Sequence, residues 1–233
     1  IPFAAPPVDA LRWQPPRPPQ RWSGVRATTA YRNDCMQEPF PSDAAPLGTK
    51  PAEDCLYLNI WKPAGATGKL PVMLWIYGGG FNVGSASMAN YAGEALAAKG
   101  AVYVSIAYRV GVLGFLAHPA LSAEGGGGSG NYGLKDQIAG LQWVKRNIAG
   151  FGGDPGNVTI AGQSAGSMSV SLLQASPAAR GLFHRVVGMS GGAFGGQMAP
   201  APLDQAEAEG LAVQQAVDAP SIEAMRDMAA DRL

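Results

Sequence analysis

The sequence predicts an α/β fold with a mostly parallel central sheet and helices on both faces. Short, continuously apolar segments recur along the chain, and helix-like segments separate them. Strands that are buried on both faces read as continuous apolar runs, and parallel strands need long, usually helical, connections. The 233 residues are 47% hydrophobic, which is enough to bury a large core. The formal net charge of +0 gives no reason to expect a nucleic-acid partner.

Residues 1–19 are rich in proline, which disfavours helices and central strands because it has no backbone donor. We expect an extended layer that Leu11 and Trp13 hold against the core; a disordered proline-rich linker is the alternative. From residue 56 onward, strands and helices alternate. The expected strands are 56–63, 70–77, 101–109, 157–161 and 185–190, and the expected helices are 90–100, 134–150, 165–176 and much of 199–233.

Two of these segments show the patterns most clearly. Segment 70–77 reads LPVMLWIY and is apolar almost throughout, as is typical of a buried parallel strand. Segment 134–150 follows a glycine-rich stretch, and its residues Leu134, Ile138 and Leu141 recur at the three- and four-residue spacing of one helix face. The longest apolar runs are too short to cross a bilayer, so we expect no membrane span.

The segment Gly162–Gly166 fits the pattern G-x-S-x-G, with Ser164 at its centre. A buried strand, 158–161, enters this segment and a helix leaves it, which is the setting of a nucleophilic serine on a strained turn. The serine hydroxyl would stand near the N-terminus of the helix, where backbone donors favour developing negative charge. The alternative is an ordinary strand-to-helix turn with a capping serine.

Three glycines, Gly78 to Gly80, directly follow the strand at 70–77 and precede Phe81. Glycines allow the main chain to approach a ligand closely and to turn its N–H groups inward. An acyl-transfer enzyme needs such donors where a carbonyl oxygen becomes an oxyanion. The triplet therefore predicts an oxyanion hole, and a flexible turn is the alternative.

The chain has two cysteines, Cys35 and Cys55. Their spacing excludes a C-x-x-C metal or redox motif. The residues leave two interpretations open: a disulfide that closes a loop in an oxidising compartment, or two reduced cysteines in a cytosolic protein.

The sequence resembles the type-B carboxylesterase family, the cholinesterase-like branch of the α/β-hydrolases, over nearly its whole length. The resemblance implies Ser164 as the nucleophile and an oxyanion hole formed by the N–H groups of Gly79, Gly80 and Ala165. The motifs that carry it, in the order of the family, are EDCLYLNIW (53–61), YGGGF (77–81), AYRVGVLGF (107–115), GNYGLKDQ (130–137), LQWVKRNIAGFGGDPGNVTIAGQSAG (141–166) and GLFHRVVGMSG (181–191).

The resemblance also implies three structural pairs. It implies a disulfide between Cys35 and Cys55, because the cysteine of EDCLYL is bridged to an upstream cysteine in many members. It further implies two ion pairs, and removal of one partner would leave an uncompensated buried charge. These expected pairs are Arg12 with Glu53 and Arg109 with Asp136.

The family places its catalytic residues in the order serine, acid, histidine. His118 precedes Ser164, and no acidic residue stands between Ser164 and His184. The resemblance therefore implies that 1–233 is a single partial α/β-hydrolase domain, whose acid and histidine lie in sequence outside this chain. Because the chain opens with Ile1 rather than methionine, we also expect that a preceding segment was removed.

The expected function is hydrolysis of a small-molecule carboxylic ester through an acyl-enzyme, with no metal and no cofactor. A second polypeptide that carries the rest of the domain is a possible partner. Gln163 stands where cholinesterases have glutamate, and the 35–55 loop offers no choline-binding tryptophan, which argues against choline esters. Tyr77, Phe81 and Trp143 are candidates for apolar walls, although Trp143 fits core packing better.

Two other functions remain as alternatives. One is a catalytically inert fragment of an esterase. The other is a non-catalytic, cholinesterase-like binding module, against which the retained serine and glycine triplet argue. A disulfide would indicate a secreted or periplasmic protein, with a cytoplasmic one as the alternative.

Overall fold

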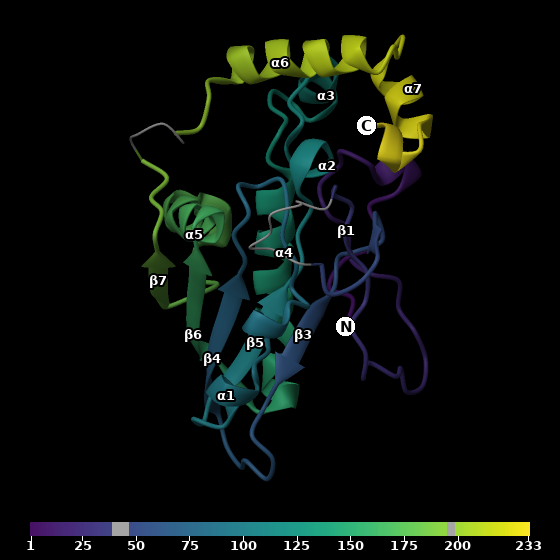
Figure 1. Ribbon diagram of the computed structural model, residues 1–233. Coiled ribbons are helices and arrows are strands. Elements are labelled where there is room, and N and C mark those ends of the chain that lie inside the picture. Colours follow the sequence, from purple (N-terminus) through teal and green to yellow (C-terminus); the bar gives the residue numbers. More distant parts are fainter. Residues whose placement is uncertain (39–46, 195–198) are drawn as a thin grey trace.

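The computed structural model describes residues 1–38, 47–194 and 199–233 and is built around a five-stranded sheet (Figure 1). The strand order is β3-β5-β4-β6-β7. β4, β5, β6 and β7 are parallel, and only β3 runs antiparallel, pairing with β5. The strands of this sheet are β3 (Leu58–Trp61), β4 (Leu70–Ile76), β5 (Val102–Ile106), β6 (Gly153–Gln163) and β7 (Arg185–Met189).

Helices cover the sheet unevenly. α4 lies behind the sheet in Figure 1 and α1 lies in front of it, while α6 crosses above the carboxyl ends of the strands and leads to α7. α4 and α5 are joined by a buried hydrogen bond of 3.1 Å from Gln137 to Ser169. The helices are α1 (Glu94–Ala97), α2 (Gly111–Phe115), α3 (Pro119–Glu124), α4 (Tyr132–Asn147), α5 (Ala165–Ala175), α6 (Leu203–Ala216) and α7 (Ile222–Asp227).

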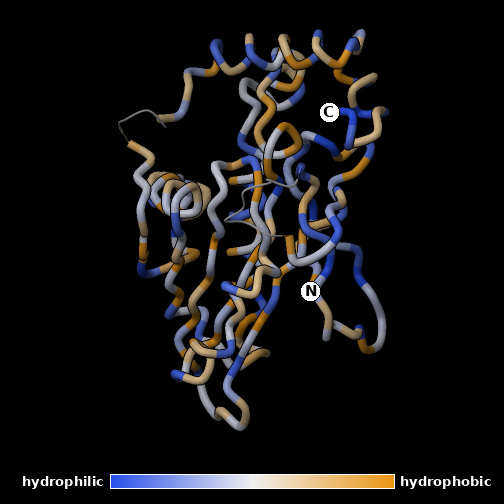
Figure 2. The backbone as a smooth tube through the Cα atoms, in the orientation of Figure 1, coloured by the Kyte–Doolittle hydropathy of each residue, from blue (hydrophilic) through white to orange (hydrophobic). Residues whose placement is uncertain are grey.

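The main core forms where the central strands meet α4. All five residues of β5 are buried, as expected for a strand with neighbours on both edges and side chains on both faces. Gly140 of α4 allows this helix to approach Ile106 of β5, because a β-carbon there would lie 3.3 Å from the isoleucine side chain. Apolar positions recur along the strands (Figure 2), which is the pattern that predicted the sheet.

A second apolar cluster ties the proline-rich start of the chain to its last helices. Trp13 is buried, as the sequence predicted, and donates from its indole N–H to the carbonyl of Val112 (2.9 Å). The buried members of this cluster are Trp13, Leu113, Leu116, Leu121, Tyr132, Ile222 and Met225. Residues 1–19 therefore form an extended layer over a core, not a disordered linker.

Arg12 adds a polar connection at the same place. Its guanidinium makes a two-pronged contact with Glu53 at 2.8 and 2.7 Å, and it also donates to the carbonyls of Met225 and Met228 at the end of α7. The guanidinium thus satisfies orphan carbonyls at a helix C-terminus, where positive charge is favoured.

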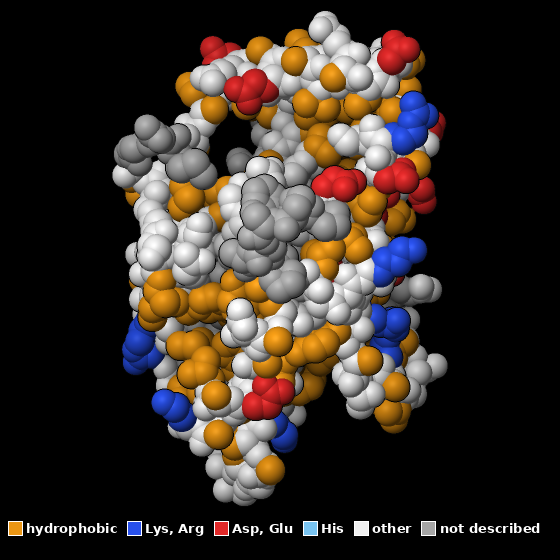
Figure 3. Space-filling model, in the orientation of Figure 1, with side chains coloured by type: hydrophobic (Ala, Val, Ile, Leu, Met, Phe, Trp, Pro, Cys, Tyr) orange, Lys and Arg blue, Asp and Glu red, His pale blue; other side chains and the backbone are white. Residues whose placement is uncertain are grey.

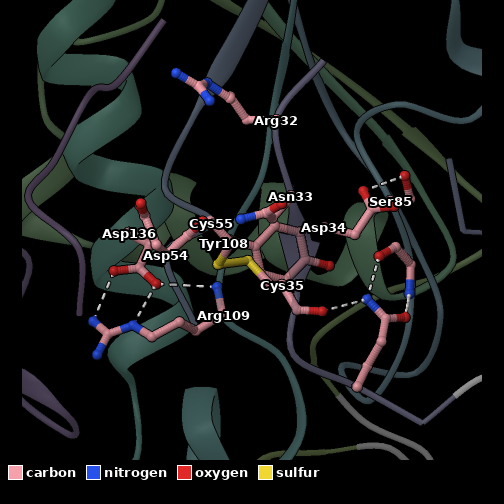
Figure 4. Close-up of a disulfide and its surroundings, with 12 residues drawn as sticks. Arg32, Asn33, Asp34, Cys35, Asp54, Cys55, Ser85, Tyr108, Arg109 and Asp136 are labelled. Atoms are coloured by element: carbon pink, nitrogen blue, oxygen red, sulfur yellow. Dashed lines mark hydrogen bonds and ion pairs between the residues drawn. A yellow bond between two sulfur atoms is a disulfide. The ribbon is translucent and has the colours of Figure 1, made fainter. Parts of the chain in front are cut away.

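A disulfide joins Cys35 to Cys55, with both residues buried. Cys35 ends β1 (Asp34–Cys35), which pairs with β2 (Pro51–Ala52) in a small parallel sheet. Figure 4 shows the disulfide with the Arg109–Asp136 ion pair on one side and the Asp34–Ser85 contact on the other. The bridge therefore fastens β1 to the segment that leads into β3. Residues 39–46 of the loop that it closes lie outside the described part of the chain.

The sheet is least covered at β7. All five residues of this edge strand are exposed, including Val186, Val187 and Met189. Its sequence, RVVGM, predicted a strand, and within the described part of the chain this strand pairs along one edge, with β6. Figure 3 shows hydrophobic side chains gathered over the strands on the face toward the viewer. Among the described residues, no helix is long and apolar enough to cross a bilayer.

Replacing both Cys35 and Cys55 by alanine should lower the free energy of unfolding by about 3 kcal/mol, because the unfolded chain regains the freedom of a loop of this length. Urea unfolding of the longest natural form of the protein would measure the change. A double mutant as stable as the wild type would contradict the proposed contribution of the bridge.

Candidate active site

The turn that carries Ser164 joins β6 to α5. Ser164 has φ 56° and ψ −123°, a conformation that a residue with a β-carbon rarely adopts. Its amide donates to the carbonyl of Met189 (2.8 Å), and its carbonyl accepts from the amide of Met168 (3.0 Å). These bonds hold the strained turn between β7 and the first turn of α5, with Ser164 half-buried at the carboxyl edge of the sheet.

Gly166 brings α5 into direct contact with the end of β4. A β-carbon at Gly166 would collide with the carbonyl oxygen of Ile76 and would lie 2.9 Å from that of Tyr77. A β-carbon at Gly162 would in turn collide with the backbone of Gly166. The two glycines of the G-x-S-x-G pattern are therefore required by close main-chain contacts.

The glycine triplet lies against the same turn. A β-carbon at Gly78 would lie 2.6 Å from the carbonyl oxygen of Gln163 and 3.1 Å from the β-carbon of Ser164. The structure thus brings together two segments that are far apart in the sequence, the loop after β4 and the turn after β6. Because both strands end at the same edge of a parallel sheet, this meeting follows from the topology.

The loop after the triplet folds back on itself. The carbonyl of Gly79 accepts from the amides of Asn82 and Val83, each at 3.1 Å. Within the described residues, the amides of Gly79 and Gly80 donate to no oxygen. Ala165 is the first residue of α5, where a helix leaves its amides without intrahelical partners. These three amides are available donors near Ser164, and their role as an oxyanion hole stays a prediction.

The loop from Gly78 to Gly84, which carries the triplet, is called the glycine loop below. Two buried tyrosines fix its start. Tyr77 and Tyr108 stack with their ring centroids 4.4 Å apart. The hydroxyl of Tyr77 donates to the carbonyl of Tyr108 (2.9 Å), and the hydroxyl of Tyr108 donates to the carbonyl of Tyr77 (2.7 Å). Burial raises the pKa of both phenols, which therefore stay neutral donors. Tyr77 thus packs in the core and is not an apolar wall of an open site.

The Arg109–Asp136 pair is fully buried beneath this region. Arg109 donates to both carboxylate oxygens of Asp136 at 2.8 Å, and its own amide also donates to that carboxylate at 3.1 Å. Burial raises the pKa of Asp136, and the Arg109 guanidinium opposes this rise. The pair fastens the residue after Tyr108 to α4 and so has a structural place in the fold.

Neither histidine of the chain bonds to Ser164 in the described structure. His118 caps the N-terminus of α3, where its Nδ1 accepts from the amide of Ala120 (3.1 Å). His184 pairs with Val158, accepting from its amide at 3.1 Å and donating to its carbonyl at 2.8 Å. His184 directly precedes β7, whereas the amide of Ser164 bonds to Met189 at the end of β7, so the two residues lie at opposite ends of that strand. The described residues also contain no group of three or more His, Cys, Asp or Glu that could hold a metal ion.

A model of the family described as "Carboxylesterase family" matches residues 1–231. The chain belongs to this family. It is 50% identical over 214 residues to the fumonisin B1 esterase of Sphingopyxis macrogoltabida and 48% identical over 203 residues to a liver carboxylesterase of Sus scrofa. These alignments cover 91% and 82% of this chain, but only 39% and 35% of the two relatives.

The solved structure of a PNB esterase superimposes on the whole chain with a TM-score of 0.88 and 40% identity. The match covers 100% of this chain and 47% of that chain. The resemblance drawn from the motifs is thereby confirmed, and so is the α/β-hydrolase fold. The chain spans about half the length of this PNB esterase and less of the curated relatives.

An apolar cavity of about 790 Å³ opens beside the turn that carries Ser164. Phe81, which follows the triplet, and Met168, one turn after Ser164, both line it. Figure 3 shows the opening beneath α6. Phe81 is therefore placed as an apolar wall, whereas Trp143 packs in the core as expected. Further lining residues from α4, α5 and α6 are Leu134, Ile138, Leu172, Leu203 and Ala206.

Sequence patterns gave no indication of one further contact at this site. Gln37 follows Cys35 by two positions and forms hydrogen bonds to Gly84, at the far end of the glycine loop. A lone glutamine in an irregular segment has no periodicity and belongs to no motif, so nothing in the sequence distinguished it.

We predict that Gly166→Ala will disrupt the Ser164 turn, because the added methyl group cannot fit against the carbonyl of Ile76. The expected cost is about 1–3 kcal/mol or more in unfolding free energy. Gly150→Ala is the matched control, since a β-carbon there meets no atom of the described residues within 4 Å. Thermal and urea unfolding of both variants would measure the difference, and equal stability would contradict the packing described.

Proposed function

We propose that the complete protein hydrolyses carboxylic esters through an acyl-enzyme on Ser164. One observation carries this proposal: Ser164 sits on a strained turn at φ 56°, in contact with the glycine loop that follows β4. Strain of this kind persists only where the surrounding structure enforces it, and it is typical of functional sites. Membership of the carboxylesterase family supports the reaction class.

In the proposed reaction, the Ser164 hydroxyl oxygen attacks the carbonyl carbon of the ester while its proton passes to a histidine base. The carbonyl oxygen becomes an oxyanion, which the N–H groups of Gly79, Gly80 and Ala165 stabilise. The alcohol then leaves with a proton, and water releases the acid from the acyl-enzyme. The apolar cavity beside Phe81 supports an ester with an apolar portion.

We further propose that the base and the acid that orients it come from the remainder of a single domain, of which 1–233 is one part. Both histidines of the chain have other places in the fold, and the curated relatives extend well beyond the matched region. A second polypeptide is an alternative source of these residues. An intact mass of the natural protein under denaturing conditions distinguishes one long chain from two shorter ones.

The decisive test is Ser164→Ala in the complete protein. Turnover of p-nitrophenyl butyrate should fall by at least about 10³-fold, because the nucleophile is removed while the oxyanion donors remain. Ser171→Ala is the matched control: this serine lies on α5, which follows Ser164, and among the described residues its hydroxyl bonds only to the carbonyl of Ser167 (3.2 Å). Substantial turnover by the Ser164 variant would overturn the assignment.

A wild-type protein that neither turns over esters nor reacts at Ser164 with a fluorophosphonate would instead favour a non-catalytic binding module. Labelling without turnover would favour an inert esterase descendant. The fluorophosphonate separates these two outcomes because it reports on the nucleophile itself.

We also propose an oxidising location, secreted or periplasmic, because a buried disulfide persists best there. If this is right, Cys35 and Cys55 in freshly isolated natural protein should resist alkylation under denaturing conditions until a reductant is added. Mass spectrometry of the alkylated protein would measure this. Two thiols that are alkylated without reduction would indicate a reducing compartment.

A further inference from the structure

We propose that Gln37 is a positioning residue that holds the glycine loop beside Ser164 and couples it to the Cys35–Cys55 disulfide. This inference rests on the proposed function, for which the loop supplies the oxyanion donors. Its basis is a set of three hydrogen bonds from one side chain. The amide nitrogen of Gln37 donates to the carbonyls of Cys35 (2.9 Å) and Gly84 (2.7 Å), and the amide oxygen of Gln37 accepts from Gly84 N–H (2.7 Å).

Gly84, which Gln37 holds, is in close contact with the start of the glycine loop. It has φ 129°, and a β-carbon there would lie 2.5 Å from the carbonyl oxygen of Gly78 and would collide with the ring of Tyr77. Gly84 therefore packs directly on the first glycine of the triplet. Gly78 in turn lies against Gln163 and Ser164, so a continuous set of contacts runs from Gln37 to the nucleophile.

The segment after Gly84 is held from the same side. Ser85 and Ser87 donate to one carboxylate oxygen of Asp34, at 2.6 and 3.0 Å, while the other oxygen accepts from the amide of Thr49 (2.8 Å). Figure 4 shows Asp34 and Ser85 beside the disulfide. Residues on both sides of Cys35 thus hold the end of the loop, and the bridge fixes Cys35 itself.

The two ends of the loop differ in how they are held. Its beginning is fixed by β4 and the tyrosine pair, which belong to the sheet. The end of the loop does not lead directly into a strand. The polar contacts of Gln37 and Asp34 hold this end instead. Oxyanion donors stabilise the transition state only when they are correctly placed, and a shift of about 1 Å is enough to lose much of their effect. Gln37 is therefore expected to act on the rate of the chemical step more than on substrate binding.

The test is Gln37→Met in the complete protein, a substitution of similar length that removes all three hydrogen bonds. We expect kcat for p-nitrophenyl butyrate to fall about 10- to 100-fold with KM nearly unchanged, less than the loss of one donor outright. The inhibition constant of a trifluoromethyl ketone, whose serine adduct resembles the tetrahedral intermediate, should rise by a similar factor. Gln214→Met is the matched control, because within the described chain the side chain of this half-buried glutamine donates only to the carbonyl of Ala219 (3.0 Å), in a remote turn.

Hydrogen exchange of the segment 77–87 supplies a readout that does not depend on turnover. Exchange should increase in Gln37→Met and stay unchanged in the control and in α4. If the variant loses thermal stability but keeps its kcat and its affinity for the ketone, the positioning role is overturned. If the wild type has no esterase activity, the proposed function fails on its own. The exchange data then decide alone: faster exchange supports the restraint on the loop, and unchanged exchange overturns it.

Discussion

The site depends on one close contact between main chains, the approach of Gly166 to the carbonyl of Ile76. This contact sets the N-terminus of α5 against the end of β4. Because β4 and β6 are neighbours in a parallel sheet, the turn after β6 and the loop after β4 then occupy the same edge. The proposed nucleophile, Ser164, and the proposed oxyanion donors of the glycine loop are thereby brought to one edge of the sheet by its topology.

The same contact explains why the turn can be strained. A serine at φ 56° costs free energy of about 1–3 kcal/mol, which the rest of the fold has to offset. The Met189 and Met168 bonds, the burial of β5 and the Arg109–Asp136 pair all stabilise the frame around it. The rigid packing around Ser164 therefore maintains the strained backbone conformation of this residue.

Sequence reasoning was most successful where a pattern has a direct physical cause. The continuous apolar runs predicted β4 and β5, and the strand-to-helix setting of G-x-S-x-G predicted the turn at Ser164. It did not predict α2, which begins at Gly111 and contains Gly114. Intrinsic propensity disfavours a helix there, but the amide of Gly111 donates to the carbonyl of Phe81 (2.6 Å), so tertiary contacts decide its conformation.

The resemblance supplied what no pattern could, the pairing of Cys35 with Cys55 and of each arginine with its acid. These pairs have one feature in common: each holds a segment that precedes or follows a strand of the sheet. The two sides of the glycine loop show the consequence. Hydrophobic periodicity could predict β4, which holds the start of the loop, but not the three bonds of Gln37 that hold its end. A polar restraint on an irregular segment leaves no periodic trace, since its geometry depends on partners distant in sequence. Residues of this kind therefore become visible only when the folded chain brings those partners together.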